Sequence, residues 1–175
     1  TYDATNDEIQ MDGTGSIVYH NTPLGHSDSG YVLIKHVSYE TAYCGILFRY
    51  DTSTDDGYVV RNNTGGVFPW RYCNDASCTS IEDGTGHTAP VWWGIVWRGT
   101  GSNTEVELYC WTLGNDPAIA IRTDPSQWAG DADNTDTMLT DPGANARDSG
   151  AYVGLYEGGG GGTHEISHFY AGDTW

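Results

Sequence analysis

The sequence is poor in residues that favour exposed helices, and it has no long apolar run. Its 175 residues include two Met and a single Lys, Lys35, against 24 Gly, seven Trp and twelve Tyr. Glycine and aromatic residues at these levels are typical of turns and strands. No stretch approaches the ~20 apolar residues of a membrane span, so we expect no membrane insertion. The composition favours an all-β protein, and the length suits a single domain over residues 1–175.

Positive charge is equally scarce. The chain has 7 Lys and Arg against 24 Asp and Glu, a formal net charge of −17. Such a surface repels phosphates and anionic membranes, which argues against nucleic acid as a partner. Asp outnumbers Glu by 17 to 7, and Asp caps turns, so we expect the acidity at strand ends. Solubility, a saline medium and the collection of divalent cations each explain the surplus.

Alternating apolar and polar residues predict several strands. The pattern is present at 30–38, 43–50, 58–62, 92–97 and 105–111, with turn-rich segments at 51–57 and 98–103 that suggest hairpins. Two more aromatic strands, 150–157 and 164–170, are joined by five glycines and are expected to form a closing hairpin. Residues 114–150 are irregular and are expected to form a long surface excursion. This order of strands predicts a two-sheet antiparallel β-sandwich or jelly roll.

The four cysteines suggest an oxidising compartment. Cys73 and Cys78 bracket a short polar loop, which favours a disulfide over free thiols or a zinc site. For Cys44 and Cys110, which lie in alternating apolar runs, buried thiols and a second bridge are both open. A start at Thr1 rather than Met suits a processed product or an excised domain. We expect an extracellular, cell-surface or virion location.

Five short runs resemble a known superfamily when taken in order. They are GILFRY at 45–50, DGYVV at 56–60, WGIV at 93–96, VELY at 106–109 and GAYVGLY at 150–156. Together they look like the laminin-G-like branch of the concanavalin A-like lectin and glucanase superfamily. The resemblance implies a jelly roll of two antiparallel sheets, one of them concave. That fold serves lectins, carbohydrate-binding modules, lyases, hydrolases, adhesins and virion proteins, so it does not decide function.

Signals for catalysis are weak. Glu105 and Glu107 place two carboxylates on one face of a strand, as hydrolases of this superfamily do. However, Val106 and Leu108 alternate with them, which is the pattern of an ordinary amphipathic strand with a solvated outer face. The sequence has no nucleophile elbow, phosphate loop or dinucleotide fingerprint. We therefore expect a protein that is not an enzyme.

Aromatic residues beside polar ones favour binding. Sugar rings present apolar C–H faces to Trp or Tyr, and their hydroxyls hydrogen-bond to Asp, Asn and Arg. The segment containing Trp70, Arg71 and Tyr72 offers this mixture, and Trp128 offers another ring within the excursion. We expect these four residues to contact a glycan.

Oxygen ligands gather in one part of the excursion. Asp131, Asp133 and Asp136 bring three carboxylates within six residues, and hard Ca²⁺ prefers oxygen ligands. The cluster lacks the glycine turn and the distal Glu of a helix-loop-helix calcium site, so the match is partial. We expect a structural Ca²⁺ here, with an acidic turn at 51–56 as a second candidate.

Together these features predict a non-catalytic domain that binds a polysaccharide or another glycan. The alternative is a structural or decoration protein of a virion or extracellular assembly, in which the same jelly roll contacts other subunits. A polysaccharide lyase or hydrolase is a weaker alternative.

Overall fold

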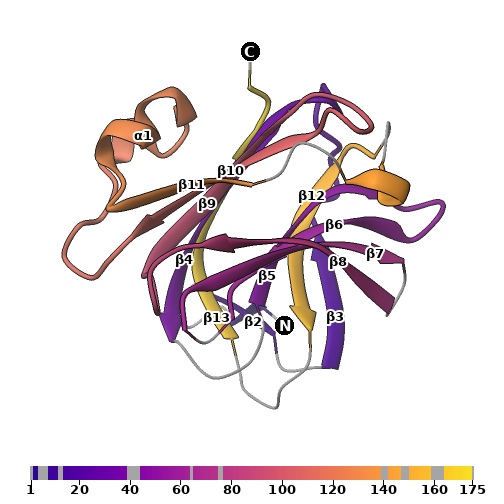
Figure 1. Ribbon diagram of the computed structural model, residues 1–175. Coiled ribbons are helices and arrows are strands. Elements are labelled where there is room, and N and C mark those ends of the chain that lie inside the picture. The colour runs from indigo at the N-terminus through magenta and orange to yellow at the C-terminus, as the bar shows by residue number, and fades with distance from the viewer. Residues whose placement is uncertain are drawn as a thin grey trace.

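Figure 1 shows the computed structural model of the protein as two packed β-sheets with a small helical segment at one side. The structure describes residues 2–3, 8–11, 14–38, 44–63, 65–74, 77–138, 142–146, 150–158 and 164–174. All strand pairs within the two sheets are antiparallel. This architecture confirms the all-β sandwich.

The seven-stranded sheet brings together both halves of the chain. In spatial order it contains β1 (Tyr2–Asp3), β2 (Glu8–Met11), β13 (His164–Gly172), β4 (Gly30–Ser38), β9 (Trp92–Arg98), β10 (Glu105–Trp111) and β11 (Asn134–Met138). The C-terminal strand β13 thus lies between β2 and β4. Strands β4 and β10 have the bounds that alternation predicts, because both are long, regular runs.

The six-stranded sheet contains the central hairpins. In spatial order it contains β3 (Thr14–Tyr19), β12 (Tyr152–Gly158), β5 (Cys44–Asp51), β6 (Asp56–Arg61), β7 (Val67–Asn74) and β8 (Ser77–Thr85). Strand β12 pairs with β3 and β5, whereas β13 belongs to the other sheet. The expected closing hairpin is therefore wrong. Alternation predicts a strand but not its partner, and each of these strands finds its neighbours far away in the sequence.

The core lies between the sheets and follows the two-residue period of the strands. Trp93, Ile95 and Trp97 of β9 all point inward, as their shared parity predicts, and all are essentially fully buried. Opposite them, Ile46 and Phe48 of β5 belong to the same cluster. The helices are short: α1 (Trp128–Asp131), η1 (Ile119–Ile121), η2 (Pro125–Gln127) and η3 (Gly143–Asn145). No helix among the described residues is long and apolar enough to cross a membrane.

The Cys73–Cys78 disulfide is present and links directly opposed residues of β7 and β8. The expected clip therefore closes the turn of a β-hairpin. Cys44 and Cys110 are both buried free thiols.

Trp70 lies in the core rather than on the surface. Its side chain has no exposed area, and its ring meets that of Tyr58 edge-on at 5.3 Å. Alternation along β7 directs Trp70 inward with Phe68. This burial corrects the expectation that Trp70 contacts a glycan.

Truncation of Trp70 is expected to destabilise the fold. Trp70→Ala removes a fully buried ring, which costs about 3–5 kcal/mol of unfolding free energy. In a domain of this size the melting midpoint falls by roughly 10 °C. Thermal unfolding followed by circular dichroism measures the change, and Ile119→Ala, at a side chain 79% exposed, is the control. An unchanged midpoint in Trp70→Ala would contradict the core assignment.

Candidate functional site

The segment between β10 and β11 covers part of the outer face of the seven-stranded sheet. Figure 1 shows it in orange beside β11. Trp128 anchors it: the ring meets Tyr31, Tyr109 and Trp111 edge-on at 5.6–5.8 Å. Its indole N–H donates to the carbonyl of Ile121 at 2.7 Å. Trp128 is fully buried, so it packs the excursion onto the sheet and does not offer a ring to a ligand.

The three aspartates expected to hold Ca²⁺ accept hydrogen bonds from separate partners. Asp131 accepts from the Trp111 indole at 2.9 Å, and Asp136 accepts from the Thr85 amide at 2.6 Å. Asp133 accepts from the Thr112 amide at 2.6 Å and from the Thr112 hydroxyl at 2.7 Å. These donors hold the pKa of Asp133 below its ordinary value. Asp131 and Asp133 thus tie the excursion to the end of β10, and Asp136 ties β11 to β8. Calcium binding stays a prediction.

An open surface remains beside this cover, where β13, β4 and β9 run next to one another. We call it the Trp92 patch and define it as Lys35, Trp92, Arg122, His168 and Tyr170. Trp92 is its buried floor. The Arg122 guanidinium lies 4.5 Å from the centre of the Trp92 ring, and the Lys35 ammonium lies 5.2 Å from it. His168 lies at 5.2 Å and Tyr170 at 6.3 Å between ring centres.

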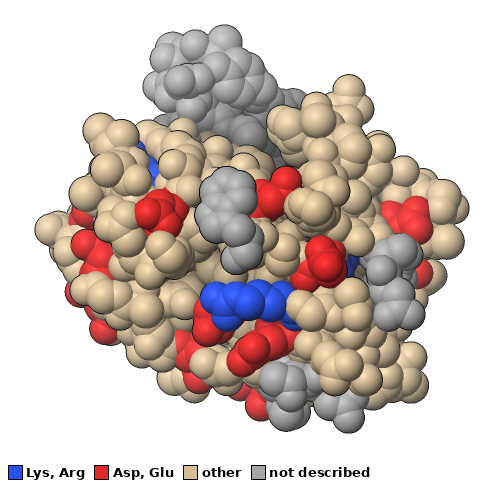
Figure 2. Space-filling view, turned by 90° about the horizontal axis from the view of Figure 1, so that it is seen from above, with Lys and Arg blue, Asp and Glu red and all other residues tan. Residues whose placement is uncertain are grey.

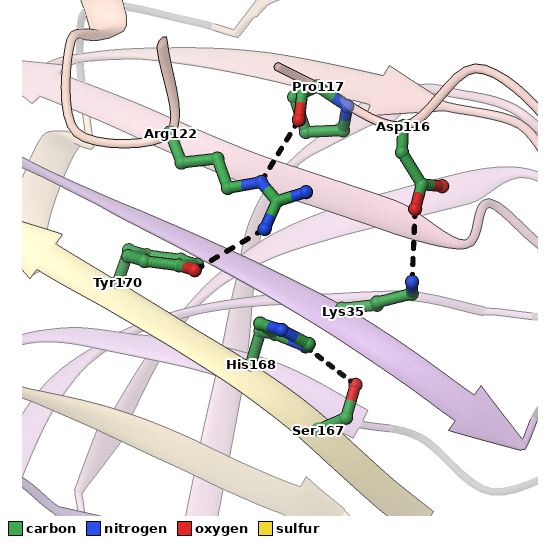
Figure 3. Close-up of polar contacts among 7 residues, drawn as sticks. All are labelled: Lys35, Asp116, Pro117, Arg122, Ser167, His168 and Tyr170. Atoms are coloured by element: carbon green, nitrogen blue, oxygen red, sulfur yellow. Dashed lines mark hydrogen bonds and ion pairs between the residues drawn. The ribbon is translucent and has the colours of Figure 1, made fainter. Parts of the chain in front are cut away.

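Hydrogen bonds fix the polar groups of the Trp92 patch (Figure 3). Lys35 pairs with Asp116 at 3.0 Å. Arg122 donates from Nε to the Pro117 carbonyl at 3.0 Å and from Nη1 to the Tyr170 hydroxyl at 3.5 Å. Partial burial alone would raise the pKa of Asp116, but the opposing effects, led by the hydrogen bond from Lys35, leave that pKa below its ordinary value. Asp116 is thus a charged acceptor at the rim.

Two open depressions flank the patch. One, of about 660 Å³, is lined by Lys35, Asp116, Leu113 and Ser167 among others. The second, of about 420 Å³, has Tyr170, Leu24 and Asp173 in its wall. The half-buried rings of His168 and Tyr170 lie stacked at 6.2 Å on one strand. The surface thus combines ring faces with cationic donors and a carboxylate acceptor.

This cationic patch stands out because the rest of the protein is so acidic. Figure 2 shows one end of the molecule, where acidic side chains are scattered over the surface and basic ones are few. Lys35 is the only lysine of the chain, and it lies in the patch together with one of the six arginines. Two cations over one indole ring therefore mark a local exception to the charge of −17.

The structure separates the residues that the sequence placed in one site. Arg71 follows Trp70 in β7 and therefore points to the opposite, outer face of the six-stranded sheet. Tyr72 returns to the inner side, where it is half-buried against the core and its hydroxyl donates to Asp56 at 3.0 Å. Trp70, Arg71 and Tyr72 therefore do not share one surface.

The six-stranded sheet has its own outer group of aromatic residues. Tyr19 is 41% exposed and lies 5.3 Å from Tyr50 and 5.5 Å from Tyr152 between ring centres. The Tyr156 hydroxyl lies 3.4 Å from the sulfur of Cys78. Because three strands separate β12 from β8, a flat sheet would hold these strands about 19 Å apart. The sheet must therefore curl toward this face, and Tyr156 fills the hollow.

Sequence reasoning missed the residues of the Trp92 patch. One signal was available, because His168 and Tyr170 share a parity in β13 and so point to one face. Nothing in the sequence places Arg122 over Trp92, since that contact depends on how the excursion folds back.

One of the two carboxylates of β10, that of Glu107, is held by hydrogen bonds to neighbouring side chains. Glu107 accepts from Arg98 and from the Tyr109 hydroxyl, both at 2.9 Å. These contacts agree with the predicted position of Glu107 on the outer face of the strand.

Comparison with solved structures supports the fold. A carbohydrate-binding module, CBM66 from Bacillus subtilis, superposes with a TM-score of 0.57 at 13% identity, covering 94% of this chain and 86% of that one. A bifunctional GH43-CE protein of Bacteroides eggerthii gives 0.45 at 9% identity, over 91% of this chain and 20% of that one. The tail fiber protein gp63.1 of an E. coli phage gives 0.42 at 11% identity, over 95% and 20%. No protein-family model matches the sequence, and no characterised protein matches it in sequence. At these identities the likeness extends to the β-sandwich fold alone.

Removal of Arg122 is expected to uncover Trp92. Arg122→Ala removes the guanidinium over the ring and two hydrogen bonds to neighbouring segments. We expect a loss of about 1 kcal/mol in unfolding free energy and stronger quenching of tryptophan fluorescence by acrylamide. Arg98→Ala is the matched control, because it also removes an arginine, but one whose guanidinium pairs with Glu107. Equal quenching in the two variants would show that Arg122 does not shield the ring.

Proposed function

We propose that the protein binds a glycan through the Trp92 patch without cleaving it, and that it does so outside the cell or on a cell or particle surface. The observation that carries the proposal is the combination of two half-buried rings, His168 and Tyr170, with Lys35, Asp116 and Arg122 around a buried indole.

The chemistry of the patch suits a sugar. Ring faces stack on the apolar C–H groups of a pyranose or furanose, while charged donors and acceptors bind its hydroxyls. The buried Trp92 and the bonds of Arg122 hold these groups in place, so little side-chain freedom is lost when a ligand binds. The two flanking depressions leave room for neighbouring sugar units.

Two further observations support the proposal. A protein named as a carbohydrate-binding module shares the fold over most of both chains. The Cys73–Cys78 disulfide suits an oxidising compartment, which supports a location outside the cytosol.

Loss of the Tyr170 ring is expected to weaken glycan binding. Tyr170→Ala should reduce retention on an immobilised panel of neutral and acidic polysaccharides by about ten-fold, because a ring contact contributes about 1.4 kcal/mol. His168→Ala should act in the same direction. Affinity electrophoresis or isothermal titration calorimetry measures the change.

Tyr19→Ala is the matched control, because Tyr19 is an exposed ring on the other sheet. Its retention should equal that of the wild type. If Tyr19→Ala loses binding and Tyr170→Ala keeps it, the glycan binds the six-stranded sheet instead. Release of reducing sugars that is lost in Glu107→Gln would indicate a hydrolase or lyase.

A second candidate function is that of a structural or decoration subunit of a virion or extracellular assembly. Leu113 and Ile119 project from the excursion with 87% and 79% of their side chains exposed, and apolar side chains in such positions can contact another protein. Sedimentation and electron microscopy test this function. Regular particles formed by a wild type that retains no polysaccharide would favour assembly.

A further inference from the structure

Three potential metal ligands meet at one end of the core. His36 lies near the end of β4, Cys44 begins β5 and His164 begins β13. Their ligand atoms all lie within 4.8 Å of one another, and all three residues are buried. Each has the inward parity of its strand, since Ile34, Ile46 and Ile166 belong to the central cluster. Among the described residues, only these three His, Cys, Asp or Glu side chains bring their ligand atoms this close together as a group of three.

A carboxylate lies close to the same place. Glu157 is opposite Cys44 in the pairing of β12 with β5, and it is only 1% exposed. Val153 and Leu155 share its parity and face the core. Burial raises the pKa of the Cys44 thiol, and the nearby Glu157 carboxylate raises that pKa further. Glu157 is thus a buried carboxylate beside Cys44, although it lies outside the group whose ligand atoms are all within 4.8 Å of one another.

Nitrogen and sulfur donors are concentrated at this end of the core. Most members of the central cluster are Val, Ile, Leu, Phe or Trp. Two histidines, a thiol and a carboxylate at one end of the sandwich are thus a chemically selective set.

The donor set indicates the kind of ion. Two imidazoles and one thiolate are the nitrogen and sulfur ligands that Zn²⁺ takes in tetrahedral sites, and a carboxylate oxygen completes four. Hard Ca²⁺ prefers six to eight oxygen ligands and does not fit. Trp93 donates to His36 Nε2 at 2.7 Å, so that nitrogen is an acceptor here. A zinc bond from either nitrogen of the His36 ring would have to replace this hydrogen bond.

We propose that His36, Cys44 and His164 hold a structural Zn²⁺ between the two sheets, with Glu157 as the fourth ligand. The ion would join β4 and β13 of one sheet to β5 and β12 of the other. Zinc binds the thiolate, so loading releases the Cys44 proton to solvent. Tetrahedral bonds of about 2.0–2.3 Å place ligand atoms about 3.3–3.8 Å apart, so His36, Cys44 and His164 close in by about 1 Å on binding. The Glu157 carboxylate must turn toward them to complete the site. The proposal is independent of glycan binding.

The test measures metal content, stability and cysteine ligation on the whole protein. The chain is unfolded in chelator, refolded with Zn²⁺ and freed of loose metal by gel filtration. We expect a single zinc ion per chain by mass spectrometry of the metal, and a higher melting midpoint that chelator reverses. Ca²⁺ should give no shift through this site. Refolding with Co²⁺ should produce the thiolate-to-cobalt charge-transfer band.

Matched cysteine variants identify the ligand. Cys110 is also a buried free thiol of the core, so Cys110→Ala controls for the loss of such a group. Cys110→Ala should keep both the zinc and the cobalt band. Cys44→Ala should lose the band and at least about ten-fold of the retained zinc. Circular dichroism checks that each variant is folded, and His164→Ala is the second test if Cys44→Ala does not fold.

Two outcomes would overturn the proposal. In the first, the wild type retains no zinc after refolding and shows no cobalt band. In the second, Cys44→Ala or His164→Ala folds and retains as much metal as the wild type, so that the ion binds elsewhere.

Discussion

The burial of two apolar sheet faces against each other is the constraint on which the rest of this structure depends. Because side chains alternate along a strand, each residue that enters the core sends its neighbours outward. Trp93, Ile95 and Trp97 fill the core, and the same strand must then place Trp92 and Val96 on its outer face. Those outer apolar groups need a cover of their own. The excursion between β10 and β11 supplies it through Trp128.

The candidate binding surface follows from this second layer. The cover protects Tyr109 and Trp111 but ends beside Trp92, where Arg122 and Lys35 close over the indole instead. Trp92 therefore has two roles. It packs against the sheet, and it forms the base of the open polar surface that His168 and Tyr170 border. The inner face of the same sheet has another exception to apolar packing, the group of His36, Cys44 and His164, in which His36 follows Lys35 in β4.

Much of the fold was predictable because it depends on local pattern. The bounds of β4 and β10 and the Cys73–Cys78 disulfide were expected from runs of fewer than ten residues. Partners distant in the chain were not. The strands on either side of the five glycines join different sheets, because β12 pairs with β5 and β13 pairs with β4. The ligand contacts expected of Trp70 and Trp128 gave way to burial for the same reason.

The sequence by itself determined the strand content, the acidic surface and the two-sheet class, since composition and a two-residue period are local properties. Only the tertiary structure decided which aromatic rings lie beneath the Trp92 patch, which lie in the core and which reach solvent. That choice depends on how residues 112–133 fold back over β9 and β10. It also decided that His36, Cys44 and His164 meet, because strands remote in sequence become neighbours only when the sheets pack.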